Sequence, residues 1–178
     1  MSEVNIVFAP SSSLRNISED VGEDEFGEEL EKHMEDMLNK MHELNGVGLA
    51  GVQVGDSRRI LVADSGSNPM MMVNPKITDK SEAKVTFQEG CLSLPGFVLD
   101  VERSESVDIE YFTPLGEKRN DKLFGTEAVV VQHEMDHLDG ITLLDKVSKL
   151  KRDIYTRKIK KLKRRIKRRI EQSNQVYY

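Results

Sequence analysis

Residues 132–137, which read Gln-His-Glu-Met-Asp-His, contain the spacing H-E-x-x-H. If this segment is helical, His133 and His137 lie one turn apart on one face, and both imidazoles can bind a single metal ion. Glu134 lies beside the first histidine, where it can accept a proton from a metal-bound water without binding the metal itself. The pattern therefore predicts hydrolysis assisted by a metal ion.

A hydrolytic site of this kind needs a third protein ligand besides the two histidines. No histidine follows His137, and the one cysteine of the chain, Cys91, lies in a segment bounded by Gly90 and Pro95. A Cys–His–His set is chemically complete, but the residues alone leave alternatives open. Cys91 can be a small buried side chain or a nucleophile with a histidine as its base. The protein can also be a zinc peptidase with a different third ligand.

A glycine-rich segment, 46–55, holds four glycines in ten residues. Glycine permits close approach of the backbone and positive φ values. The segment is not a phosphate-binding loop, because it lacks the G-K-[ST] ending and the G-x-G-x-x-G spacing. On its own it is more typical of a structural turn.

Three segments, in this order, resemble the signature motifs of peptide deformylases: G-x-G-L-A-x-x-Q at 46–53, E-G-C-L-S at 89–93 and Q-H-E-x-D-H-L-x-G at 132–140. The resemblance covers about residues 4–147. It implies an enzyme that removes the formyl group from N-formylmethionine on nascent polypeptides and releases formate, with metal-bound water as the nucleophile.

The resemblance also implies roles for individual residues. Glu134 would be the general base, passing a proton to the leaving amine. Gln53 and the backbone amide of Leu92 would donate hydrogen bonds to the oxyanion. One divalent ion is expected per chain, typically Fe²⁺ in this family, with Zn²⁺ or Ni²⁺ able to replace it. The implied metal ligands are Cys91, His133 and His137.

The substrate site is expected beside the motifs. Gly48 would allow close approach of the peptide backbone, and a pocket for methionine should be apolar. Gln132 and Asp136 would hold the loop and the helix in register, although Asp136 fits a plain surface position equally well. The other residues expected at the substrate site are Val47, Phe87, Glu89, Gly90, Val129 and Val130.

Two positions depart from the family pattern. Gly51 stands where the family more often has alanine, so slight loosening beside the site is expected without loss of activity. Phe97 and Val98 follow Pro95-Gly96, where many bacterial members carry an arginine that helps to hold the peptide. The contacts to the peptide backbone are therefore expected to differ, while the chemistry is retained.

Helical and strand patterns predict the elements that position these residues. Apolar residues recur at steps of three and four over 26–44, which predicts a helix ending at Asn45-Gly46. The run 128–131 fits a helix or a strand, and the H-E-x-x-H spacing favours the helix. The pattern predicts an α+β fold, with mainly antiparallel sheets packed around a central metal-binding helix, plus an N-terminal helix and a basic C-terminal helix. Strands are expected at 4–8, 59–63, 70–73, 84–87, 97–101 and 106–112.

Charge divides the chain unevenly. Residues 1–145 hold 12 Lys and Arg against 29 Asp and Glu, whereas residues 146–178 hold 14 against 2. This predicts a catalytic domain over 1–147 and a basic helical extension over 148–178. Bacterial relatives in the resembled family use a C-terminal helix at the ribosome, so rRNA is the expected partner, with an anionic membrane or the acidic body as alternatives. The helix pattern covers 146–170, with a narrow apolar stripe of Leu150, Ile154, Ile159, Leu162, Ile166 and Ile170.

Composition excludes several classes of protein. At 178 residues and 38% hydrophobic content the chain suits one core-forming domain. A single cysteine rules out an internal disulfide and fits a reducing compartment. No apolar run approaches the ~20 residues of a membrane span, and the start lacks a signal-peptide pattern. A cytoplasmic monomer is expected. A basic-tailed nucleic-acid-binding module with structural histidines is the alternative from another functional class.

Overall fold

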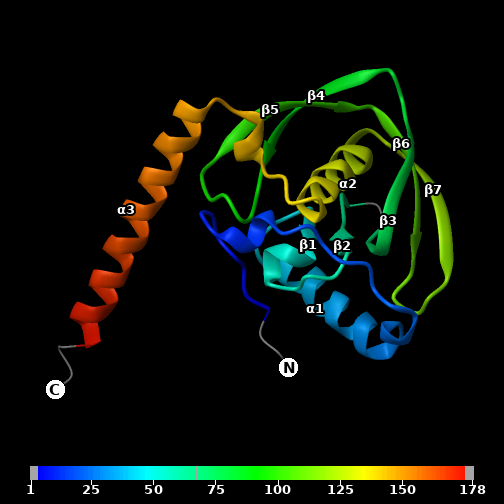
Figure 1. Cartoon of the computed structure of the whole chain (residues 1–178), viewed down its shortest axis with the longest axis horizontal. Coiled ribbons are helices and arrows are strands. Elements are labelled where there is room, and N and C mark those ends of the chain that lie inside the picture. Colours follow the sequence, from blue (N-terminus) through cyan, green and yellow to red (C-terminus); the bar gives the residue numbers. More distant parts are fainter. Residues whose placement is uncertain (1–3, 67, 175–178) are drawn as a thin grey trace. The chain divides into compact units, whose positions relative to one another are not determined.

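A computed structural model of the chain describes residues 4–66 and 68–174, with side chains described up to Leu162 and at Arg164 and Arg165. The described residues form three α-helices and seven β-strands, besides short 3-10 turns (Figure 1). The helices are α1 (Glu28–Glu43), α2 (Gly125–Leu138) and α3 (Lys149–Asn174). The strands are β1 (Gly48–Ala50), β2 (Ile60–Ala63), β3 (Met70–Lys80), β4 (Lys84–Gly90), β5 (Val98–Ser104), β6 (Ser106–Phe112) and β7 (Lys118–Phe124).

The strands form two antiparallel sheets. One has five strands in the order β1-β2-β3-β6-β7, and the other is the two-stranded sheet β4-β5. In every ladder between these strands the pairing is antiparallel. The expected α+β class with mainly antiparallel pairing is therefore confirmed.

The side chains of β2 point alternately to the two faces of the larger sheet, and each face packs against a different helix. Ile60 and Val62 pack in the cluster that contains α1, while Leu61 and Ala63 pack in the cluster that contains α2. Successive strand residues point to opposite faces, so one fully buried strand serves both cores. The side chains that α1 contributes are Leu30, Met34, Met37 and Met41, the stripe expected from the sequence.

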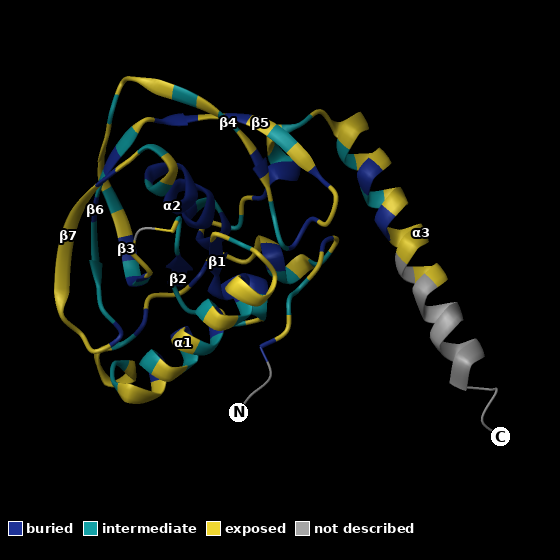
Figure 2. Ribbon diagram, turned by 180° about the vertical axis from the view of Figure 1, so that it is seen from behind, coloured by how far each residue is buried: buried dark blue, intermediate teal, exposed yellow. Residues whose placement is uncertain are grey.

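Helix α2 is buried along most of its length. Ala128 and Val131 are fully buried, and His133, Glu134 and His137 on the next turns are buried as well. Figure 2 shows α2 almost entirely in the colour of buried residues, in contrast to the exposed outer face of α1. A helix that is buried on every side reads as a continuous apolar run, which explains why 128–131 had no clear period. The helical interpretation of that run is confirmed.

Three segments differ from the expected strands. Gly48–Ala50 forms β1 inside the glycine-rich segment that was expected to be a turn. Residues 4–8 belong to no strand; Val7 N–H donates to the Gln53 carbonyl (2.7 Å), and Ala9 N–H donates to the Ser93 carbonyl (2.9 Å). Conversely, β7 has the polar sequence Lys-Arg-Asn-Asp-Lys-Leu-Phe, and only its Leu123 is buried. An edge strand that is open to solvent on one face needs little apolar alternation, so the period-2 pattern could not reveal it.

The chain forms two compact units, one ending at Thr142 and the other beginning at Leu143. The division into domains 1–147 and 148–178 stays a prediction. In the part of the chain that the structure describes, no helix is long and apolar enough to cross a membrane.

The prediction that the apolar residues of the basic helix form a single stripe is wrong. A residue advances a helix by about 100°, so the five-residue step from Ile154 to Ile159 moves to a different face. Leu150 and Ile154 are 66% and 56% exposed, whereas Ile159 is 3% exposed. The last two residues of the expected stripe, Ile166 and Ile170, lie outside the described side chains.

Candidate metal centre

Three potential metal ligands converge from two elements. His133 and His137 occupy successive turns of α2, and Cys91 is the first residue after β4. The possible ligand atoms of the three side chains all lie within 4.8 Å of one another. Cys91 Sγ lies 3.2 Å from His137 Nε2, and the two imidazole rings are 5.0 Å apart at an angle of 71°. The structure thus brings together the three residues that the sequence suggested.

The chemistry of this donor set fits a divalent transition metal. One sulfur and two imidazole nitrogens are ligands that Fe²⁺, Zn²⁺ and Ni²⁺ all accept. Cys91 and His133 also line a pocket, so one side of the site faces open space. Three protein ligands with one open side are typical of catalytic rather than structural metal sites.

A chain of charged groups orients His133. Its Nδ1 lies 2.8 Å from Glu89 Oε2, while Arg103 donates two hydrogen bonds to Glu89, from Nε (2.7 Å) and Nη2 (2.9 Å). Arg103 Nη1 also donates to Asp136 Oδ2 (2.6 Å). Because Nδ1 is engaged by Glu89, the other ring nitrogen, Nε2, is free to serve as a ligand atom.

Burial and these hydrogen bonds set the pKa values of the charged groups around His133. Burial raises the pKa of Glu89, but the hydrogen bonds from Arg103 and His133 outweigh it and bring the pKa to about 2. Glu89 is therefore a carboxylate at neutral pH and can hold the imidazole that faces it. Its side chain contacts His133 and Arg103, which suits it to orient the imidazole. The expected contact of Glu89 with substrate stays a prediction.

The two histidines differ in charge. Burial lowers the pKa of His137 to about 3, so its ring is neutral. Burial acts in the same direction on His133, but hydrogen bonds with Cys91 and Glu89 outweigh it and raise its pKa to about 10. A proton on His133 competes with a metal ion for the same lone pair, so metal binding is expected to release that proton.

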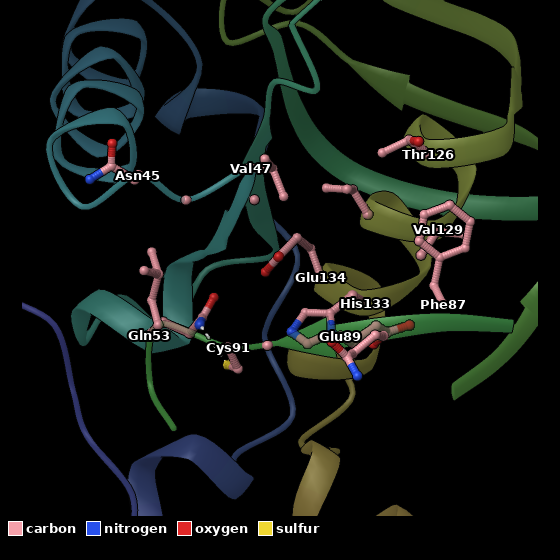
Figure 3. A pocket seen from close by; sticks show the side chains of 16 residues that line it. Asn45, Val47, Gln53, Phe87, Glu89, Cys91, Thr126, Val129, His133 and Glu134 are labelled. Atoms are coloured by element: carbon pink, nitrogen blue, oxygen red, sulfur yellow. Dashed lines mark hydrogen bonds and ion pairs between the residues drawn. The ribbon is translucent and has the colours of Figure 1, made fainter. Parts of the chain in front are cut away.

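Glu134 has the environment of a proton acceptor. Its side chain is 3% exposed and lines the pocket, and its Oε2 has no hydrogen-bond partner among the described residues. Burial raises its pKa to about 7, against the lowering effect of the His133 and Arg103 charges. A carboxyl group with a pKa near the operating pH is well suited to general-base catalysis. Figure 3 shows Glu134 on the wall of the pocket near Val47 and His133.

Gly48 makes room for this carboxylate. A Cβ atom on Gly48 would lie 2.9 Å from both Cγ and Cδ of Glu134, and closer still to Oε1. The backbone of β1 therefore packs directly against the Glu134 side chain. The sequence suggested that this glycine admits the substrate backbone, whereas the structure shows that it already accommodates a catalytic candidate.

We expect Gly48→Ala to lower kcat by ~100-fold, because an added methyl group must displace the Glu134 carboxylate and a shift of about 1 Å can cost this much. The measurement is steady-state formate release from a formylated peptide, with metal content and thermal midpoint determined on the same sample. A variant with wild-type kcat would show that the position of the carboxylate does not matter.

The two expected oxyanion donors lie beside the metal ligands. Gln53 is 1% exposed; its Oε1 accepts a hydrogen bond from Ala50 N–H (2.7 Å), and its Nε2 approaches Cys91 Sγ at 3.5 Å. Leu92 follows Cys91 directly and lines the same pocket. The oxyanion role of these two groups stays a prediction.

The pocket has a volume of about 390 Å³ and is lined by every residue expected at the substrate site. Val129 and Val130 are buried, whereas Val47 is 50% exposed and lies at the mouth. Four further lining residues were not expected at the substrate site: Asn45, Gly46, Gln88 and Thr126. Gly46 is the first residue of the motif at 46–53, whereas the other three lie outside the three motifs.

Arg103 is the functional candidate that sequence reasoning missed. It is 6% exposed, although arginine is rarely buried unless it is paired. The strand pattern carried a weak signal of this burial, since Arg103 lies two residues after Val101 and therefore on the same inward face of β5.

Asp136, which fitted a surface position equally well, pairs with Arg103. The Gln132 side chain accepts a hydrogen bond from Ser104 N–H and donates one to the Ser104 carbonyl, so it joins α2 to strand β5 rather than to a loop.

The structure explains the first of the two departures from the family pattern, Gly51. A Cβ on Gly51 would lie 2.9 Å from the Arg58 carbonyl oxygen and 3.0 Å from Ile60 Cγ1. The space is filled by neighbouring backbone, so the expected loosening does not occur. Phe97 is buried and Val98 is exposed, and neither lines the pocket.

Comparison with known proteins identifies relatives of this chain. Residues 4–153 match the family model described as polypeptide deformylase. The chain is 43% identical to peptide deformylase 1 of Rickettsia conorii, over 93% of this chain and 99% of the relative. It is 38% identical to peptide deformylase of Brucella suis, over 91% and 94%. The crystal structure of Ehrlichia chaffeensis peptide deformylase in complex with actinonin matches with a TM-score of 0.86 and 38% identity, over 92% of this chain and 99% of the other.

Proposed function

Because the chain belongs to the polypeptide deformylase family, and is therefore a hydrolase that deformylates nascent peptides, we propose the residues that carry out this reaction. Cys91, His133 and His137 hold one divalent metal ion, with Fe²⁺ as the expected species and Zn²⁺ or Ni²⁺ as substitutes. The observation that carries the proposal is the convergence of their ligand atoms within 4.8 Å at a pocket that also contains Glu134. When bound, such an ion acts as a Lewis acid and activates water.

The side chains around the site divide the remaining chemistry. Glu134 accepts a proton from the attacking water and delivers it to the leaving amine. Gln53 Nε2 and the Leu92 N–H donate hydrogen bonds to the oxyanion that forms on the formyl oxygen when water attacks the formyl carbon. Glu89 keeps the His133 ring in its binding orientation, and Arg103 keeps Glu89 ionised. The products are formate and a peptide with a free N-terminus.

The pocket and two strand edges support recognition of an N-terminal methionine. Val47, Phe87, Val129 and Val130 provide an apolar wall for an unbranched thioether side chain. Strands β1 and β4 each pair with a neighbour on one side only. We infer that the peptide backbone lies between these edges, in contact with Gly48, Glu89 and Gly90, as in other cases of strand addition.

The test is formate release from a formyl-methionyl tripeptide by protein that contains one metal ion per chain. We expect turnover with the formylated peptide and none with the acetylated peptide of the same sequence, because the larger acyl group must fit against the same donors. Equal turnover of both peptides, or turnover that survives complete metal removal, would contradict the proposed site.

We further propose that the basic extension delivers the enzyme to ribosomal RNA, and that the enzyme works where translation occurs, in the cytoplasm. Helix α3 presents exposed cations such as Lys160, Lys161, Arg164 and Arg165, and so many like charges on one helix repel each other unless a polyanion neutralises them. An anionic membrane is the competing partner, and the exposed Leu150 and Ile154 would suit it.

Neutralising the four exposed cations on α3 to glutamine should weaken sedimentation with ribosomes by at least tenfold and reduce its salt dependence. Turnover of a free tripeptide should not change, because none of the four cations lines the pocket. The matched control replaces four exposed cations of the sheet, Lys76, Lys118, Arg119 and Lys122, and should sediment like wild type. Unchanged sedimentation of the α3 variant, with lost binding to anionic vesicles, would favour the membrane instead.

A further inference from the structure

The orientation of the Gln53 carboxamide is determined by its surroundings. The backbone N–H of Ala50 can only donate, so the carboxamide oxygen must face it, at 2.7 Å. The NH₂ group must then point to the opposite side, where Nε2 donates to Ser93 Oγ at 3.2 Å and approaches Cys91 Sγ at 3.5 Å. Figure 3 shows the carboxamide directed toward Cys91. One amide hydrogen is thus held by Ser93, and the other faces the metal site.

Ser93 is well placed to fix this geometry. It has no solvent exposure, so water cannot replace its hydroxyl as an acceptor for Gln53. It lies two residues beyond Cys91, in the turn closed by Leu94 N–H donating to the Cys91 carbonyl (2.9 Å). The metal ligand and the acceptor for Gln53 therefore belong to one short, rigid turn.

The segment at residues 7–9 ties the two partners of this hydrogen bond together. Val7 N–H donates to the carbonyl of Gln53, and Ala9 N–H donates to the carbonyl of Ser93. One stretch of extended chain therefore holds the backbones of both residues. The distance between Gln53 and Ser93 is therefore constrained by these backbone hydrogen bonds as well as by the hydrogen bond between their side chains.

From these contacts we infer that Ser93 is a positioning residue, whose hydroxyl holds the Gln53 carboxamide so that its second N–H meets the oxyanion. The inference rests on the proposed oxyanion role of Gln53. Without the hydroxyl, a buried N–H loses its acceptor, and the carboxamide turns toward other partners such as Cys91 Sγ. Misplacing a transition-state donor lowers kcat and leaves KM nearly unchanged.

The test is a double-mutant cycle of wild type, Ser93→Ala, Gln53→Ala and the double variant, with kcat and KM for a formyl-methionyl tripeptide. We expect Gln53→Ala to lose ~10²- to 10³-fold in kcat, as other oxyanion donors do, and Ser93→Ala to lose about tenfold. Because Ser93 acts through Gln53, the double variant should be no slower than Gln53→Ala alone. Metal content and thermal midpoint are measured on all four proteins.

The matched control is Ser18→Ala, which removes another buried hydroxyl, one without a hydrogen-bond partner among the described residues, and should keep wild-type kcat. Two outcomes would overturn the inference. In one, the kcat of the double variant falls by the product of the two single-variant losses. In the other, Ser93→Ala keeps wild-type kcat while Gln53→Ala is slow. Full activity of Gln53→Ala would instead refute its proposed oxyanion role. If Ser93→Ala does not fold, Ser93→Gly tests the same loss of the hydroxyl.

Discussion

Glu134→Gln is expected to lower kcat for formate release by ~10³-fold, within the 10²–10⁴-fold range that a general base contributes. The amide has the same size and shape as the carboxyl group, but it cannot accept the proton of the attacking water. Glu134 Oε2 has no hydrogen-bond partner among the described residues, so the substitution breaks no side-chain contact at that atom. Kinetics and metal content are measured on the same preparation, and one metal ion per chain should remain.

The control for this variant is Glu127→Gln, in the first turn of the same helix and outside the lining of the pocket. It removes the same charge from α2 and should keep wild-type kcat. If Glu134→Gln stays within tenfold of wild type while metal is bound, another group takes the proton.

Cys91→Ala is expected to abolish tight metal binding and to lower activity by more than ~10²-fold. Losing a group that merely supports a metal ligand already costs about 10- to 100-fold, and here a ligand itself is removed. The two remaining imidazoles, with ring centres 5.0 Å apart, cannot complete a three-ligand site. The measurements are metal stoichiometry after dialysis and formate release with added Zn²⁺.

The outcome also separates the alternatives that the sequence left open. A variant that keeps its metal and loses activity would make Cys91 a nucleophile, with metal chemistry elsewhere. A variant that keeps both would make it a buried side chain and would point to a peptidase-like site with another third ligand. Loss of metal and activity together is the expected result.

Much of the site could be predicted because its signals are local. The i,i+4 spacing of His133 and His137 fixes their common face as soon as the segment is helical, and the segment proved to be α2. The apolar stripe of α1 and the antiparallel strands also follow from short-range periodicity. The same rule failed where burial does not follow a simple period, as in the polar edge strand β7 and the extended residues 4–8.

Other features depend on contacts that no spacing encodes. The buried Arg103 joins Glu89, 14 residues away, to Asp136, 33 residues away. The roles of Gly48 and Gly51 depend on which atoms face their missing side chains, namely the Glu134 carboxylate and the Arg58 carbonyl. Neither neighbour can be read from the glycine-rich segment itself.

The sequence by itself determined the kind of chemistry, the family resemblance and the division of charge between an acidic body and a basic extension, because these depend on residue types and short spacings. Only the tertiary structure decided that Cys91 meets His137 across 46 residues, that the Glu89 carboxylate contacts the His133 ring, and that the Ser93 hydroxyl accepts a hydrogen bond from Gln53. Such contacts arise when α2 packs between the sheets and excludes water, and packing depends on the whole fold at once.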